Sequence, residues 1–198
     1  MGASDRRLDV PWLEALLGAG VFYGGPTSEA SAFTGRDVFI VGGANSAGQA
    51  ALHLARYARA VTLVVRANSL RAGMSEYLVR QIEATDNIQT RLGCQVVGGG
   101  GDGRLEHLVL RDIGSQTEAM VKANALFLLI GAQPNTDWLP PNIERDEHGF
   151  VLTGADVSQR RAWPLDRSAF LLETSMPGVL AAGDVRHEFK EFKIATPG

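Results

Sequence analysis

The segment from Val38 to Arg66 constrains the fold more than any other part of this sequence, because it combines a buried strand, a glycine-rich turn, a helix and a second strand. The run DVFIV is short, apolar and rich in β-branched side chains, which is typical of a buried strand. In the following NSAGQAALHLARYA, Ala47, Ala51 and Leu54 recur on one helical face, and AVTLVV then predicts the next strand. The strands of such a βαβ unit are parallel and its crossover is right-handed.

The remaining sequence predicts further layers around this unit. A helix is expected after Ser75, with Met74, Leu78 and Ile82 as its apolar stripe, and the runs IQTRLGCQVVGG, LEHLVLRD and EAMVKANALFLLIG predict later strands. Alternation within LEHLVLRD favours a small antiparallel piece. We therefore predict an α/β fold, Rossmann-like, in which a parallel sheet is flanked by helices and carries a small antiparallel β-meander insert.

Two glycine-containing stretches predict a loop and a further strand. The low-complexity patch GGGGDG, residues 98–103, is most simply a hairpin loop. The stretch PGVLAAGD, residues 177–184, predicts one more buried strand that ends in Gly-Asp. Upstream of the βαβ unit, we expect a connecting segment with one short strand at residues 20–23.

Length and composition limit the class of protein. The 198 residues suffice for one large domain, or for one domain with pieces of another. A net charge of -3 without a long basic run argues against nucleic acid as a partner. No apolar run approaches about 18 residues, and MGASDRRLDVPW lacks the apolar stretch of a signal peptide. We therefore expect no membrane span and a cytoplasmic location.

The glycine-rich turn has the pattern of a site for a diphosphate. In such a turn the first glycine makes the bend, the second admits the phosphate and the third small residue lets helix and strand pack. Here Ala44 stands at the second position and adds a methyl group where a pyrophosphate comes closest. The candidate pyrophosphate residues are Gly42, Gly43, Ala44, Asn45, Ser46 and Ala47. Asn45 or Ser46 is expected to cap the helix, and the alternative is a tight turn that binds nothing.

The end of the second strand favours NADPH over NADH. An acid there would accept hydrogen bonds from the ribose 2′-hydroxyl, but VVRANSLR contains none. Arg66 and Arg71 could instead pair with a 2′-phosphate through charge-assisted hydrogen bonds. The alternative is that both are solvated surface arginines.

Four sequence blocks follow one another along the chain: VGGANSAGQAA, VTLVVRANSLRA, LFLLIGAQPNT and TSMPGVLAAGDVR. In this order they resemble thioredoxin reductase and its low-molecular-weight flavoprotein relatives in the pyridine nucleotide-disulfide oxidoreductase family. The resemblance covers nearly the whole chain and implies an FAD/NAD(P)-binding fold. It matches Gly131 to a strand-end turn near the cofactors, and Gly183 with Asp184 to the Gly-Asp whose acid hydrogen-bonds the ribityl chain of FAD.

The resemblance also implies a domain organisation. Residues 1–35 correspond to a remnant of the FAD-binding domain and a linker, residues 36–140 to the NAD(P)H-binding domain, and residues 141–198 to a return into a partial FAD-binding domain. The ends of the sequence lack the first glycine fingerprint of the family and the helix that covers the flavin pyrophosphate, so we expect this chain alone to hold little FAD.

Two departures from the family pattern bear on its chemistry. Thioredoxin reductases carry a Cys-x-x-Cys where this sequence has Gly24 and Thr27, and Cys94, its one cysteine, is expected to be a packing residue. The His-Arg-Arg cluster and later Arg that hold the 2′-phosphate in the family correspond here to Val65, Arg66, Ala67 and Arg71. Two of the four groups remain, which weakens the preference for NADPH without reversing it.

The sequence thus predicts the NAD(P)H-binding part of a thioredoxin reductase-like flavoprotein oxidoreductase, which positions NADPH for hydride transfer to FAD without a dithiol of its own. No catalytic side chain and no metal site are expected, because the chemistry belongs to the cofactors. Two alternatives stay open: an inactive or regulatory nucleotide-binding remnant, and part of a ferredoxin- or flavodoxin-NADP reductase of the same fold. The electron acceptor and homodimer formation also stay open.

Overall fold

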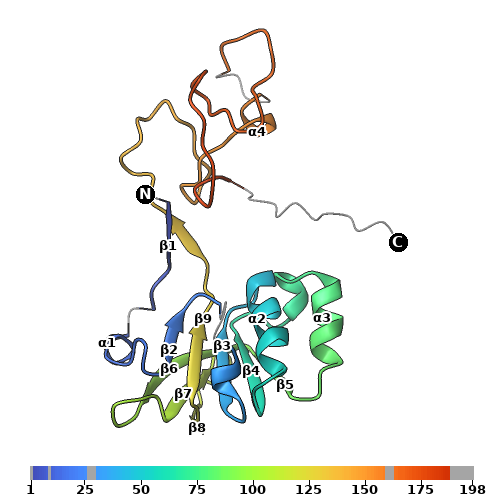
Figure 1. Cartoon of the computed structure of the whole chain (residues 1–198), viewed down its shortest axis with the longest axis vertical. Helices are drawn as coiled ribbons and strands as arrows, with labels where there is room; N and C mark the ends of the chain where they lie inside the picture. The colour runs from blue at the N-terminus through green and yellow to red at the C-terminus, as the bar shows by residue number, and fades with distance from the viewer. Residues whose placement is uncertain (1, 9, 26–29, 159–162, 188–198) are drawn as a thin grey trace. The chain divides into compact units, whose positions relative to one another are not determined.

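The computed structural model describes residues 2–8, 10–25, 30–158 and 163–187 (Figure 1). The chain divides into two compact units, one of residues 7–131 and one that joins residues 1–6 to residues 132–198. The larger unit contains the glycine-rich turn and the whole βαβ segment.

A five-stranded sheet forms the centre of the larger unit. Its strands run in the order β2 (Val21–Tyr23), β9 (Ala125–Leu128), β3 (Asp37–Val41), β4 (Ala60–Val65) and β5 (Ile88–Leu92), as Figure 1 shows. Each neighbouring pair is parallel. The predicted parallel sheet is therefore confirmed, and its central strands are continuous apolar runs because both faces are covered.

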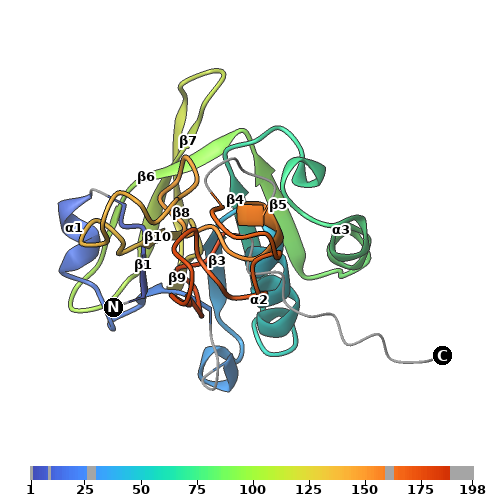
Figure 2. The same cartoon turned by 90° about the horizontal axis from the view of Figure 1, so that it is seen from above.

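Helices cover one face of this sheet (Figure 2). They are α2 (Asn45–Ala55) and α3 (Glu76–Glu83), with the short 3-10 helices η1 (Ala30–Phe33) and η2 (Leu70–Ala72). The predicted apolar face of α2 is buried in this core, which also takes in alternate residues of β3, β4 and β9. The helices form because apolar residues recur at a helical spacing that matches this one face.

The opposite face carries a three-stranded antiparallel meander of β6 (Cys94–Gly100), β7 (His107–Asp112) and β8 (Glu118–Lys122). With α1 (Pro11–Glu14) it covers a second apolar core, to which the other set of alternate sheet residues contributes. Figure 2 shows the meander and α1 on the side of the sheet away from α2 and α3. The predicted antiparallel insert is confirmed.

The prediction of a hairpin loop at residues 98–103 is wrong in its first half, because β6 continues to Gly100. A Cβ atom at Gly99 would lie 2.6 Å from the Trp12 ring and 2.7 Å from the carbonyl oxygen of His107. Glycine is therefore used inside this strand so that a tryptophan from α1 can lie directly on its backbone.

The smaller unit has little regular structure in its described residues. Its strands β1 (Ala3–Asp5) and β10 (Ala132–Pro134) pair antiparallel, and α4 spans Ala155–Ser158. The prediction of a buried strand at residues 177–184 is wrong: Leu180 makes only an isolated bridge and is 63% exposed. An apolar run becomes a buried strand only where neighbouring strands pair with its backbone, and the described residues offer no such ladder here.

The two compact units have bounds of their own. Residues 7–35 are part of the sheet unit, since β2 pairs with β9 and becomes an edge strand of the sheet. The sheet unit ends at residue 131, and the smaller unit resumes at residue 132. No helix in the described part of the chain is long and apolar enough to cross a membrane.

Candidate functional site

The candidate site lies at the edge of the sheet where β3, β4 and β9 end. Because these strands are parallel, the residues after them meet there: Gly42 after β3, Arg66 after β4 and Leu129 after β9. The chain passes from β3 through α2 to β4 on one side, whereas β9 flanks β3 on the other. Ligands of open α/β sheets bind in the crevice at such a reversal of strand order.

Gly42 is held by close packing against the strand beside it. Its N–H donates to the carbonyl oxygen of Val64 at 3.2 Å. A Cβ atom at Gly42 would lie 2.5 Å from the carbonyl oxygen of Leu129 and 2.9 Å from the Cβ of Ala47. No side chain fits at this position, and Ala47 must be small for the same reason.

The start of α2 opens directly after this turn. Ala44 is its N-cap residue, in an extended conformation with φ -99° and ψ 176°, and its exposed methyl group does not disturb the backbone. Its carbonyl oxygen accepts from the N–H groups of Ala47 at 3.1 Å and Gly48 at 3.3 Å. Within the described ranges no acceptor pairs with the N–H groups of Asn45 and Ser46. These free donors and the helix dipole favour an anion here.

The expected capping role of Asn45 or Ser46 is wrong, because α2 has no side-chain cap. The Asn45 Oδ1 atom instead accepts a hydrogen bond from the Ser75 N–H at 2.8 Å. Nearby, a Cβ atom at Gly73 would lie 2.9 Å from the carbonyl oxygen of Gly43. These two close approaches hold the loop of residues 66–75 against the glycine turn. They join positions about 30 residues apart, so no local sequence pattern predicts them.

The two candidate arginines in this loop have different surroundings. Arg66 is exposed, and no carboxylate pairs with it among the residues that the structure describes. Arg71 lies between two carboxylates, with Nε 3.0 Å from Glu76 and Nη1 3.1 Å from Glu83. Hydrogen bonds to Glu83 and Glu76 raise the pKa of Arg71 above its usual value. Arg66 is therefore the arginine available to a new anion.

The other candidate positions are distributed over both units. Gly131, with φ +93°, is exposed at the end of the sheet unit. Gly183, with φ +81°, and the exposed Asp184 belong to the smaller unit. Within the sheet unit the structure thus brings together residues 42–47, Arg66 and Arg71, whereas Gly183 and Asp184 belong to the smaller unit.

Cys94, the one cysteine of the sequence, lies in the sheet unit. Cys94 is 8% exposed within the core under the meander, which confirms its predicted packing role. Burial raises the pKa of the Cys94 thiol, so this cysteine is protonated at neutral pH. Of the two positions that the sequence resemblance aligned with a dithiol, Gly24 donates its N–H to the carbonyl oxygen of Leu128 at 3.1 Å. Thr27 lies outside the described residues.

A parallel sheet, a glycine turn that admits no side chain, and a helix starting at the strand-order reversal together define a Rossmann-like α/β protein. Its sequence matches the profile of the pyridine nucleotide-disulphide oxidoreductase family over residues 1–197. The chain belongs to this family, and within it to the thioredoxin reductase-like flavoprotein oxidoreductases.

Individual relatives support this assignment. The chain is 30% identical to thioredoxin reductase of Chlamydia trachomatis over 204 residues, which cover 100% of this chain and 59% of that protein. It is 29% identical to an alkyl hydroperoxide reductase component of Staphylococcus epidermidis over 197 residues, which cover 100% of this chain and 35% of that protein. The crystal structure of T. acidophilum thioredoxin reductase aligns with a TM-score of 0.76 at 25% identity, covering 95% of this chain and 56% of that one. The chain thus spans little more than half the length of the thioredoxin reductases it matches.

Proposed function

We propose that the sheet unit is the NADPH-binding part of a thioredoxin reductase-like flavoprotein, and that it positions NADPH for hydride transfer to FAD without a redox dithiol of its own. The observation that carries this proposal is the backbone approach at Gly42. A turn with no room for a Cβ atom, followed by free N–H groups at the start of α2, is the arrangement that a pyrophosphate requires.

The preference for NADPH rests mainly on Arg66. Its guanidinium follows β4 at the same edge as the glycine turn, where the adenosine ribose of a dinucleotide would lie. A 2′-phosphate carries nearly two negative charges near neutral pH, so a free guanidinium there favours NADPH over NADH. Arg71 can contribute only if it exchanges part of its contact with Glu76 and Glu83 for the phosphate.

The flavin belongs to this proposal through the family and through Asp184. Gly183 and Asp184 would hold the ribityl chain of FAD. The exposed Asp184 carboxylate can accept hydrogen bonds from the ribityl hydroxyl groups. When both cofactors are bound, the reduced nicotinamide supplies a hydride to the flavin; the role of these residues is to bind and orient. Gly131, after β9, would border the nicotinamide end of the site.

A cytoplasmic location and a homodimer are further parts of this proposal, whereas the electron acceptor stays open. The names of the relatives include both a thioredoxin reductase and an alkyl hydroperoxide reductase component, so they do not single out one acceptor. A nucleotide-binding remnant without turnover is the second candidate function, and the methyl group of Ala44 favours it because it stands near the pyrophosphate position.

Calorimetric titration of the full chain with NADPH and with NADH tests the proposal. Arg66→Ala should weaken NADPH binding by about tenfold or more and barely change NADH binding, and the difference should shrink in salt. Ala44→Gly should strengthen both equally, since the two dinucleotides share the pyrophosphate. Arg56→Ala, at the far end of α2, is the matched control.

Each outcome separates the candidate functions. Equal weakening of NADPH and NADH by Arg66→Ala would remove the specificity argument. Absence of NADPH and NADH binding in the wild type and in Ala44→Gly would contradict the NADPH-binding proposal and leave an inactive remnant that keeps the nucleotide-binding fold but binds neither dinucleotide.

A further inference from the structure

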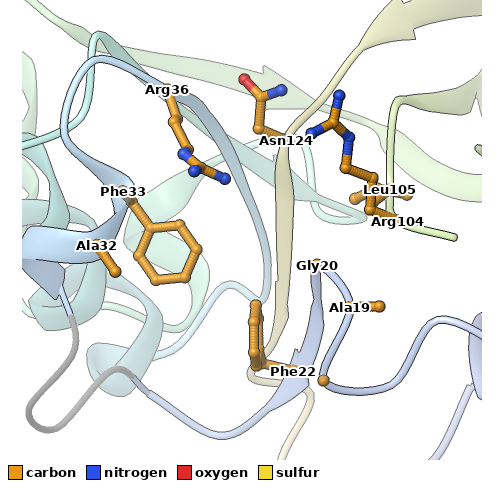
Figure 3. Close-up of a pocket in the computed structure, with 10 residues that line it drawn as sticks. Ala19, Gly20, Phe22, Ala32, Phe33, Arg36, Arg104, Leu105 and Asn124 are labelled. Atoms are coloured by element: carbon orange, nitrogen blue, oxygen red, sulfur yellow. The ribbon is translucent and has the colours of Figure 1, made fainter.

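The sheet unit has a pocket of about 450 Å³ at the edge opposite the glycine turn (Figure 3). Its lining includes Gly20, Arg36 and Asn124, the residues directly before β2, β3 and β9. The amino ends of parallel strands lie on the edge away from their carboxyl ends, and five residues of β3 separate the two edges by about 16 Å. This pocket is therefore not part of the dinucleotide site.

One wall of the pocket is rich in hydrogen-bond donors with positive charge. Arg36 is exposed, and its guanidinium makes no hydrogen bond or ion pair within the described residues. In the described part of the chain the Arg104 guanidinium pairs with Glu106 alone, at 3.6 Å, and both side chains are exposed, so this pair is weak. Figure 3 shows the guanidinium groups of Arg36 and Arg104 on either side of Asn124.

Asn124 adds a fixed donor between the two arginines. Its Oδ1 atom accepts from the Asp37 N–H at 3.1 Å, which orients the amide and leaves its NH₂ group free to donate. The nearest aspartate does not offset the positive charge, since the Asp37 carboxylate already pairs with Arg59. This wall thus offers several hydrogen-bond donors to an anion. Among the described residues the one carboxylate that opposes an anion here is that of Glu106, which is held by the weak pair with Arg104.

The remaining wall is aromatic and rigid. The Phe22 and Phe33 rings meet edge to face with centroids 5.7 Å apart, and Phe22 also stacks on Phe127 at 5.1 Å. Gly20 packs closely against Leu105 and Asn124, because a Cβ atom at Gly20 would lie 2.7 Å from the Cβ of Leu105 and 3.1 Å from the carbonyl oxygen of Asn124. The aromatic pair is fixed by the core and does not need to reorganise to receive a flat apolar group.

We propose that this pocket binds a small aromatic carboxylate. The carboxylate would pair with Arg36 through a two-pronged contact, with Arg104 and the Asn124 amide as further donors. The ring would lie against Phe22 and Phe33. The pocket volume is within the range of small-molecule sites, and the combination of an apolar wall with a few convergent polar groups is what such sites share.

Calorimetric titration of the full chain with 2-naphthoate tests this inference, with 2-naphthamide as the uncharged probe and inorganic phosphate as the anion without a ring. We expect 2-naphthoate to bind about tenfold or more tightly than either. Arg36→Gln should lower its affinity by a similar factor, and thermal unfolding of the variant should match the wild type because the Arg36 guanidinium has no partner among the described residues. Arg66→Gln, at the opposite edge, is the matched control and should leave 2-naphthoate binding unchanged.

Measuring the NADPH affinity of the same variants separates this inference from the proposed function. Arg36→Gln should leave NADPH binding unchanged, so either proposal can fail without the other. Amide resonances of the ¹⁵N-labelled chain should shift with 2-naphthoate at Gly20 and Asn124. Equal affinity of wild type and Arg36→Gln for 2-naphthoate, equal affinity of acid and amide, or shifts confined to residues 42–47 would each overturn the inference.

Discussion

The side-chain oxygen of Asn45 accepts a hydrogen bond from the backbone N–H of Ser75 at 2.8 Å, and this bond joins the first residue of α2 to the N-cap residue of α3. The two residues are 30 positions apart in the sequence. Between them lie β4 and the loop that carries both candidate arginines. The bond therefore fixes the geometry of Arg66 and Arg71 relative to the glycine turn.

Replacing Asn45 with alanine should loosen this connection. Asn45→Ala leaves the Ser75 N–H without its partner, and we expect the free energy of unfolding to fall by about 0.5–1.5 kcal/mol. Urea denaturation measures this change. Ser46→Ala is the matched control, because Ser46 makes no side-chain hydrogen bond in the described part of the chain and should be nearly neutral. A larger loss for Ser46→Ala would mean that Ser46, and not Asn45, organises the helix start.

Glu83 should restrain Arg71 from acting on a phosphate. Glu83→Gln removes one of the two carboxylates beside Arg71, and it also removes a negative charge near the proposed 2′-phosphate. Because the pair is exposed, we expect NADPH to bind only about two- to fivefold more tightly, with NADH unchanged. Glu118→Gln, which breaks a similar pair with Arg111 in the meander, is the control. A gain that is equal for both dinucleotides would contradict a role of Arg71 at the 2′-phosphate.

Gly42→Ala should destabilise the sheet unit strongly. The added methyl group would meet the backbone oxygen of Leu129, which cannot move without disturbing the pairing of β9 with β3. We expect a loss of about 2 kcal/mol or more in the free energy of unfolding, measured by urea denaturation. Gly25→Ala is the control, since its Cβ would lie 4.0 Å from the Leu129 side chain, an ordinary contact. Equal effects of the two variants would refute the packing argument.

The parallel core could be predicted from sequence because its signals are local. Each signal lies within a dozen residues: the apolar run of β3, the apolar face of α2 and the apolar run of β4. The structure contains all three elements. The glycine turn is equally local, since its requirement for small residues is set by the strand and helix that flank it.

The features that sequence reasoning missed depend on contacts between distant residues. The glycines of β6 extend the strand because Trp12 covers them, and residues 177–184 form no strand because their described strand pairing is limited to the isolated bridge between Leu180 and Glu173. The partners of Arg71 did leave a signal. Glu76 and Glu83 are seven residues apart, so they share one face of a helix that begins just after Arg71.

A buried carboxylate organises the smaller unit. The Glu173 side chain is 1% exposed and accepts two hydrogen bonds from Arg167, at 2.7 and 2.9 Å, and two from the N–H groups of Phe170 and Gly178. The Arg167 hydrogen bond is the main cause that lowers the pKa of Glu173 to about 2, against the opposing effect of burial. All four hydrogen bonds favour the ionised form.

This arrangement predicts an acid-sensitive unit. Because the folded pKa of Glu173 lies below its ordinary value of 4.5, its contribution to stability is fully present above pH 4.5 and is lost as the pH falls toward 2. Glu173→Gln should lower stability at pH 7 and show a weaker decline into acid than the wild type. Urea denaturation and amide exchange at Gly178, followed from pH 7 to pH 3, measure both effects. Glu147→Gln, at an exposed carboxylate of the same unit, should keep the wild-type acid dependence. An unchanged acid decline in Glu173→Gln would show that another group sets the acid limit.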